Sequence, residues 1–269
     1  MRMIVRFGKR ARLRFISHLD LQRFFQRALN RTGLPIAFSN GFNPHPVMAF
    51  GSALALGWTS EYEVIDVKLA EDVDALAAKE AMQAALPEDL PVLEVKMVGD
   101  RTPSMMPLVC AARYRIENSG VTQEMLDRFR QAETVMAVRK TKSGEKEVNI
   151  RPMAYEFALT EDGTLLAELS LTPENTLKPD LMVKALTGEI PEGMRIHRTS
   201  LLAEGERGRR IPLMEKLYCG KYCWTPSAGR PAPPYTKTGF CANTPRRSAA
   251  GRAWWEISMW AGYATCCRE

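Results

Sequence analysis

The feature that most constrains the fold is an order of elements that the sequence predicts twice: strand, helix, two strands, helix, strand. The first occurrence consists of MIVRFGK (strand), residues 17–33 (helix), strand-like runs over residues 36–38, 47–57 and 61–70, residues 73–86 (helix) and LPVLEVKMV (strand). The second consists of LVCAARYRI (strand), VTQEMLDRFRQA (helix), TVMAVRK with KEVNIRPM (strand pair), TLLAELSLTP (strand), NTLKPDLMVKALTG (helix) and MRIHRTSLL (strand). This order predicts an α+β chain of two tandem ferredoxin-like (βαββαβ) domains.

The predicted boundaries divide the chain into four parts. Residues 1–100 form the first ferredoxin-like domain with a basic N-terminal region, residues 101–107 are a linker, and residues 108–214 form the second domain. Each domain has about 100 residues, which is a typical size for a small domain. Residues 215–269 contain four of the five tryptophans but no valine, and they show no helical or strand periodicity, so they predict no fold.

This C-terminal tail also holds five of the six cysteines. They are Cys219, Cys223, Cys241, Cys266 and Cys267. Their spacing is not a recognised zinc-ligand pattern and the tail has no histidine, so no metal site is predicted. A disordered segment would explain the tail, but translation out of frame explains its abrupt change in composition better. The sixth, Cys110, lies in an apolar run and is predicted to be buried and unreactive.

The most strongly marked helix begins after Ser17. Ser17 and Asp20 resemble a short capping box, and Gly33 with Pro35 ends the helix. One apolar face recurs at helical spacing, through Leu21, Phe24, Phe25, Ala28 and Leu29. Arginines at a spacing of four form a stripe on another side, through Arg23, Arg27 and Arg31.

Positive charge is concentrated at the N-terminus. The chain has a net charge of +6, but residues 1–31 hold nine Arg or Lys against the single acid Asp20, and residues 32–214 are acidic overall. A basic segment on an acidic body predicts a local anionic partner. The alternative is that these arginines form only a solvated face.

The topology of the first predicted domain suggests one anion-binding end. In a ferredoxin-like unit the first helix begins at the end of the sheet where the second and third strands are joined. Ser17–Asp20 and the loop Gly41–Pro46 are therefore expected at the same end, with His18 and His45 as neighbours. Backbone N–H groups at a helix start favour an anion such as phosphate. The predicted ligand-binding residues are Arg10, Arg12, Arg14, Ser17, His18, Arg23, Arg27, Phe42, Asn43 and His45, with Phe42 stacking on a base.

Two histidines and one acid are candidates for catalysis: His18, His45 and Asp20. In Asn43-Pro44-His45-Pro46 the prolines hold His45 stiffly, which suits contact with a ligand. Equally, the prolines enforce a turn in which His45 bonds locally. His18 is a general acid or base, a phosphate contact or a structural residue at the helix start, and Asp20 either orients it or caps the helix. His197 is interpreted as structural.

Several functions are excluded by missing patterns. The sequence has no phosphate-binding Gly-rich loop with Lys-Ser/Thr, no dinucleotide fingerprint after a strand and no H-E-x-x-H. The three-cysteine cluster of a radical S-adenosylmethionine (SAM) enzyme is absent too. No apolar run reaches the length of a membrane span or signal peptide, so a cytoplasmic protein without cofactors is expected.

Two motifs resemble a known family. F-I-S-H-L-D (Phe15–Asp20) and G-F-N-P-H-P (Gly41–Pro46), followed by ALALG and EYEVIDVKL, closely resemble the radical-SAM-linked family of bacterial proteins. This domain of unknown function occurs alone or at the C-terminal end of radical SAM proteins, and the likeness covers residues 2–214. It implies a bacterial cytoplasmic protein that works with a radical SAM partner. Such proteins are often encoded beside a ribonuclease, which suggests RNA as the ligand, but the resemblance supplies no catalytic residue.

Three functions follow as hypotheses. The first is an accessory module that binds an anionic ligand, most of all RNA, between Arg10–Asp20 and Gly41–Pro46. The second is a metal-independent endoribonuclease, since two ferredoxin-like domains with a histidine beside the first helix resemble CRISPR repeat-processing enzymes. The third is a protein adaptor for a radical SAM enzyme that docks through the Arg23, Arg27 and Arg31 face.

Overall fold

The computed structural model describes residues 1–141 and 144–217 and confirms a mixed α+β fold with a large, mostly antiparallel sheet. The strands of this part are β1 (Arg2–Lys9), β2 (Met48–Phe50), β3 (Thr59–Lys68), β4 (Val92–Val98), β5 (Val109–Glu117), β6 (Met136–Thr141), β7 (Gly144–Asn149), β8 (Ala154–Leu159), β9 (Leu165–Ser170), β10 (Arg195–Glu204) and β11 (Arg210–Pro212). The predicted tail, with its five cysteines, lies almost wholly outside the described residues.

Six α-helices and three short 3-10 helices complete the described part. They are η1 (Ala11–Phe15), α1 (His18–Arg31), α2 (Ala75–Ala85), α3 (Met105–Leu108), α4 (Gln123–Gln131), η2 (Arg151–Met153), α5 (Pro179–Thr187), η3 (Glu206–Gly208) and α6 (Leu213–Lys216). None of these helices is long and apolar enough to cross a membrane.

Helix α1 forms where its periodicity predicts it. The Ser17 hydroxyl accepts a hydrogen bond from the Asp20 N–H (3.2 Å) and donates one to the Asp20 carboxylate (2.7 Å). Gly33 adopts a φ of +70°, which turns the chain away after the last residue of the helix. The buried side chains are Leu21, Phe25, Ala28 and Leu29, on the predicted face.

One nine-stranded sheet contains strands of both predicted domains, all but β6 and β7. Its order is β4-β1-β3-β10-β5-β9-β8, with β2 beside β3 and β11 beside β10. Every neighbouring pair is antiparallel except β3 and β10, which meet in parallel over His197–Thr59 and Arg198–Ser60. This short junction joins the first half of the chain to the second.

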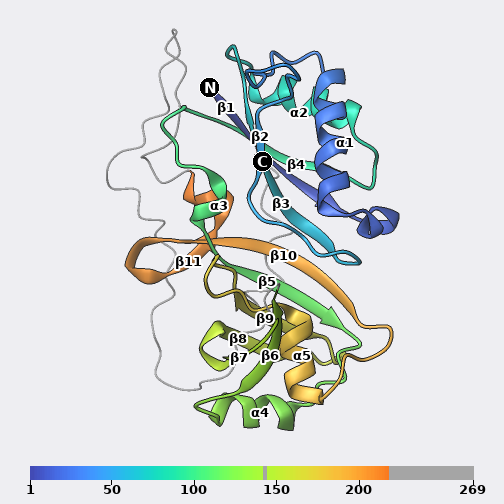
Figure 1. The fold of residues 1–269 in the computed structure, drawn as a ribbon, viewed down its shortest axis with the longest axis vertical. Coiled ribbons are helices and arrows are strands. Elements are labelled where there is room, and N and C mark those ends of the chain that lie inside the picture. The colour runs from blue at the N-terminus through green and yellow to red at the C-terminus, as the bar shows by residue number, and fades with distance from the viewer. Residues whose placement is uncertain (142–143, 218–269) are drawn as a thin grey trace, which may run out of the picture. The chain divides into compact units, whose positions relative to one another are not determined.

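Helices cover the sheet in two groups (Figure 1). In the first half, α1 and α2 pack on an apolar cluster that includes Phe7, Phe25 and Ile65. In the second half, α4 and α5 pack on a cluster that includes Leu126, Met182 and Tyr114. Burial of these two apolar clusters is the main stabilising contribution to each half.

The second strand of the first half differs from the prediction. Residues 36–38 form only isolated bridges, between Ile36 and Leu69 and between Phe38 and Pro46, and the strand that pairs with β3 is β2. The G-F-N-P-H-P loop therefore belongs to the connection from α1 to β2. Figure 1 shows this connection near the N-terminus, where β1 begins, whereas η1 and the start of α1 lie where β1 ends. The predicted single end was therefore wrong.

The second half also departs from the predicted strands. TVMAVRK and KEVNIRPM contribute β6 and β7, which pair with each other in a separate two-stranded sheet. The edge strand next to β9, on the side away from β5, is β8, and no strand was predicted over its residues. The last three residues of the predicted linker, 105–107, belong to α3, in which Met105 is buried.

Candidate functional site

Seven side chains come from η1 and the residue before it, from the first two turns of α1 and from the segment before β3. They are Arg10, Arg12, Arg14, Phe15, Leu19, Arg23 and Leu56, and we call them the basic–apolar surface. Leu56 belongs to the segment that joins β2 to β3, and this segment meets η1 where the Gly57 N–H donates to the Arg14 carbonyl (2.8 Å). The surface thus combines two segments that are about 40 residues apart in the sequence.

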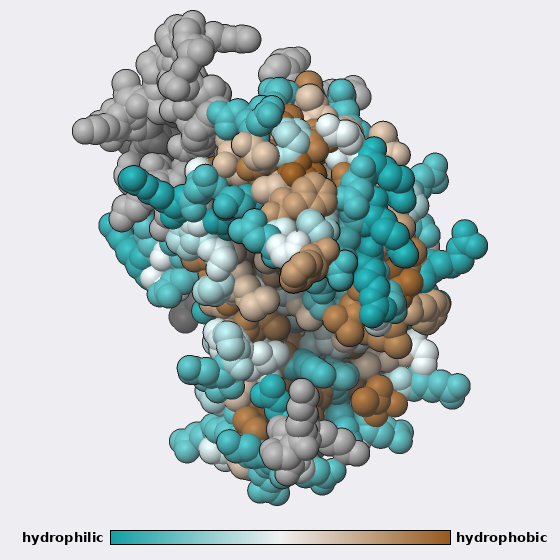
Figure 2. Space-filling model, turned by 45° about the horizontal axis from the view of Figure 1, so that its top comes forward, coloured by the Kyte–Doolittle hydropathy of each residue, from teal (hydrophilic) through white to brown (hydrophobic). Residues whose placement is uncertain are grey.

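Apolar side chains of this surface are unusually exposed. Phe15 is 62% exposed, Leu19 63% and Leu56 62%. The Arg14 guanidinium lies over the Phe15 ring, 4.6 Å from its centroid. Arg12 is exposed, and Arg23 pairs with Asp20 at 3.3 Å. In Figure 2, apolar side chains reach the surface among hydrophilic ones on the face that is drawn.

A buried group of charges lies beneath this surface. Lys9 at the end of β1, Glu63 in β3 and Arg198 in β10 are each at most 2% exposed. Arg198 Nη1 donates to Glu63 Oε1 at 3.2 Å. Buried charges persist only when paired and hydrogen-bonded, so Glu63 is the group that makes burial of the two cations tolerable.

The buried charges also fix the segments above them. Lys9 Nζ donates to the carbonyl of Ile16 (3.0 Å), between η1 and α1. Arg198 Nη2 donates to the carbonyl of Ala53 (3.0 Å), in the segment before β3. Both carbonyls lie in irregular backbone, which lacks ladder partners. The network therefore positions the basic–apolar surface without forming part of it.

Burial shifts the acidity of these groups. Burial lowers the pKa of Lys9, and the neighbouring Arg198 lowers it further, while Glu63 opposes the shift. Burial raises the pKa of Glu63, and the cations of Arg198 and Lys9 oppose that shift. For both Lys9 and Glu63, the opposite charge nearby favours the ionised form that burial disfavours.

His18 lies between the surface and the apolar core. Its ring meets the Phe50 ring edge-on, with centroids 5.0 Å apart. Burial lowers the pKa of His18, and the charge of Lys9 lowers it further. Asp20 and Ser17 form the cap of α1, so the structure places Asp20 with the cap rather than against the His18 ring. The lowered pKa favours the neutral form of the His18 imidazole.

We predict that the free energy of unfolding decreases as the pH falls, and that His18 contributes to this decrease. Its pKa in the folded state is below the ordinary 6.5, so the contribution is complete above about pH 6.5 and is lost as pH decreases. His18→Gln should reduce the loss of unfolding free energy between about pH 7.5 and pH 5.5, measured by urea titration. An unchanged pH dependence would contradict this assignment.

The G-F-N-P-H-P loop forms a separate exposed hairpin. Ser39 N–H donates to the His45 carbonyl (2.9 Å), and the Ser39 hydroxyl lies 2.9 Å from His45 Nδ1. Phe42 is fully exposed, and Asn43 is exposed beside it. His45 thus bonds locally, and it does not meet His18, because the loop follows the C-terminal end of α1. Phe42, Asn43 and His45 cannot share one site with the η1 arginines.

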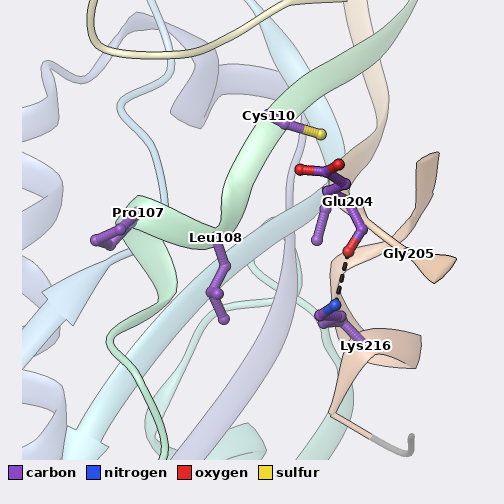
Figure 3. Close-up of a pocket in the computed structure, with 7 residues that line it drawn as sticks. Pro107, Leu108, Cys110, Glu204, Gly205 and Lys216 are labelled. Carbon is purple, nitrogen blue, oxygen red and sulfur yellow. Dashed lines mark hydrogen bonds between the residues drawn. The ribbon is translucent and has the colours of Figure 1, made fainter. Parts of the chain in front are cut away.

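A cavity with a volume of about 320 Å³ lies between α3, β10 and α6 (Figure 3). Lys216 Nζ donates to the Glu204 carbonyl at its rim (2.7 Å). The Cys110 thiol faces it half-buried, and burial raises the pKa of Cys110, which disfavours the reactive thiolate. Across residues 1–141 and 144–217, no group of three or more His, Cys, Asp or Glu side chains could hold a metal ion.

The buried charges were missed although the sequence contains a signal for them. In EYEVIDVKLA the alternation places Glu63 on the same face as Ile65 and Val67, which are buried. An acid on an otherwise apolar face predicts a buried partner. Its partner Arg198 is 135 residues away, so the sequence alone could not identify it.

The comparison with known families agrees with the bacterial resemblance. The profile of a family described as an uncharacterised protein conserved in bacteria matches residues 2–179. No curated protein matches the chain. The matched region includes the whole basic–apolar surface and Glu63, and it ends where α5 begins.

Proposed function

The chain belongs to this bacterial family, DUF2344, and we propose that it is an accessory module that binds an anionic ligand, with RNA as the best fit, through the basic–apolar surface. The observation that supports this most is the group of exposed Arg10, exposed Arg12 and half-buried Arg14 on a segment whose backbone is held by Lys9. Arginine side chains on such a surface make salt-sensitive contacts to phosphates.

The proposal includes the bacterial setting that the motifs suggest. F-I-S-H-L-D provides part of the basic–apolar surface, and its resemblance to the radical-SAM-linked family supports a radical SAM protein as the partner, in the cytoplasm. We also interpret the sheet as two ferredoxin-like units. The order β4-β1-β3-β2 in the first half and β10-β5-β9-β8 in the second supports this interpretation.

Binding of bulk tRNA and rRNA to the full chain across a salt series tests the proposal. We expect affinity that falls steeply with salt, and Arg12→Ala/Arg14→Ala should weaken it and make the slope of log K against log salt shallower by roughly 2. The matched control is Arg128→Ala/Arg130→Ala, which removes two arginines at the same spacing from α4. Equal losses in both variants would mean that RNA meets the chain by net charge alone.

The same samples, examined on a gel, test the endoribonuclease alternative. Cleavage abolished by His18→Ala would support catalysis at the α1 start. The structure separates His18 from His45, so a two-histidine mechanism within one chain has no geometric support. A neutral His18 could still serve as a general base.

The adaptor is the second candidate, and one feature favours it. Residues 32–60 contain no Asp, Glu, Lys or Arg, and they expose Phe38 (48%), Phe42 (106%) and Val47 (37%). An uncharged exposed hairpin suits a protein partner better than RNA. A stable complex with a radical SAM protein that is lost in Phe42→Ser, without RNA binding at low salt, would decide for the adaptor.

A further inference from the structure

We propose that the basic–apolar surface selects single-stranded RNA, with an unstacked base on Phe15 and apolar contacts from Leu19 and Leu56. This inference rests on the proposed RNA binding and names the class of RNA. The three side chains come from η1, α1 and the segment before β3. Their exposure is therefore not explained by the periodicity of any single element.

The apolar side chains of this surface are exposed although their backbone is fixed. Phe15, Leu19 and Leu56 are each more than 60% exposed, although η1 and the segment before β3 are fixed by the buried network below. Leu54, two residues before Leu56, is buried in the same segment. Grouped apolar side chains on a fixed surface indicate an interaction site.

An exposed aromatic ring favours a single strand over a duplex. In an RNA duplex the bases are stacked inside, and a protein meets phosphates and 2′-hydroxyls. An exposed phenylalanine gains little from such a surface. A single strand offers flat base faces that stack on an aromatic ring, and the Arg14 guanidinium over the Phe15 ring at 4.6 Å extends the stack with a cation.

The charge next to Phe15 is positive. Arg10, Arg12 and Arg14 lie within the same six-residue stretch as Phe15, and the only acid of residues 1–31 is Asp20, which bonds to Ser17 and pairs with Arg23. Phe15 and Leu19 thus belong to an arginine-rich part of the chain, and the Arg14 guanidinium contacts the Phe15 ring. Charge complementarity favours a polyanion with apolar faces, which describes a single-stranded nucleic acid, over a neutral protein surface.

The test uses the full chain and four probes. These are an oligouridylate of about 10 nucleotides, a duplex of equal length, an abasic strand with the same number of phosphates, and an acidic leucine-containing peptide. We expect the oligouridylate to bind best. Phe15→Ala should weaken it by about 5- to 100-fold and leave the abasic strand almost unchanged. Leu76→Ala, which removes a 65% exposed side chain from α2, is the matched control and should have no effect.

The outcomes separate this inference from the proposed function. Absence of binding to every RNA probe would overturn both. Equal affinity for single strand and duplex, or an equal loss for the abasic strand in Phe15→Ala, would overturn base stacking and leave RNA binding intact. Preference for the acidic peptide would assign the surface to a protein partner instead.

Discussion

Replacing Glu63 by glutamine is expected to lower the free energy of unfolding by about 3–5 kcal/mol. Glutamine keeps the size of the side chain but removes the charge that Arg198 meets at 3.2 Å. Lys9 and Arg198 then remain buried without the Glu63 carboxylate, and they repel each other in a medium of low dielectric constant. Urea titration followed by circular dichroism measures the loss.

Glu168→Gln is the matched control for this prediction. Glu168 is 1% exposed and pairs with Arg113 and Arg210, but the side chains of these arginines are 26% and 29% exposed and so reach water. We expect a smaller loss, on the order of 1–2 kcal/mol. Equal losses in the two variants would show that burial of the cations does not set the cost. A Glu63→Gln chain as stable as the original would contradict the assigned network.

Phe25→Ala should lower the free energy of unfolding by about 3–5 kcal/mol. Phe25 is fully buried, and its ring centroid lies 4.7 Å from that of Phe7 and 5.7 Å from that of Phe50. The change removes the contacts of the Phe25 ring with Phe7 in β1 and Phe50 in β2 and leaves a cavity that the rigid sheet cannot close. Because stability is typically 5–15 kcal/mol, the variant should have a markedly lower melting temperature.

Phe24→Ala provides the control one position earlier. Phe24 lies at the edge of the same cluster and is only partly buried, so the same change in volume should cost clearly less. The comparison separates burial from helix propensity, which is identical for the two substitutions. Similar losses would indicate that the apolar face of α1 is broader than the structure shows.

The fold of α1 could be predicted because its determinants are local. The apolar spacing from Leu21 to Leu29 and the Ser17 cap lie within a few turns of each other, and the structure confirms both. The position of β2 could not be predicted in the same way. Both residues 36–38 and residues 47–57 have strand-like composition, and pairing with β3 decides between them.

That single decision changes the candidate site. With β2 at Met48–Phe50, the His45 hairpin follows the end of α1, and the segment before β3, with Leu56, takes its place beside the η1 arginines. Phe15 and Leu56 were therefore absent from the predicted site residues, while Phe42 was included. Of the two motifs, F-I-S-H-L-D adjoins the basic charge and G-F-N-P-H-P does not.

The sequence by itself determined the helix α1, the excess of positive charge in residues 1–31 and the α+β class, because periodicity and composition act between near neighbours. The tertiary structure alone decided which segments meet: the joining of both halves in one sheet, the separation of His18 from His45, and the ion pair of Glu63 with Arg198. The first and the last of these features depend on contacts between residues more than 100 positions apart, and the separation of the histidines depends on the register of β2 with β3. The free energy of each such contact depends on the whole fold around it.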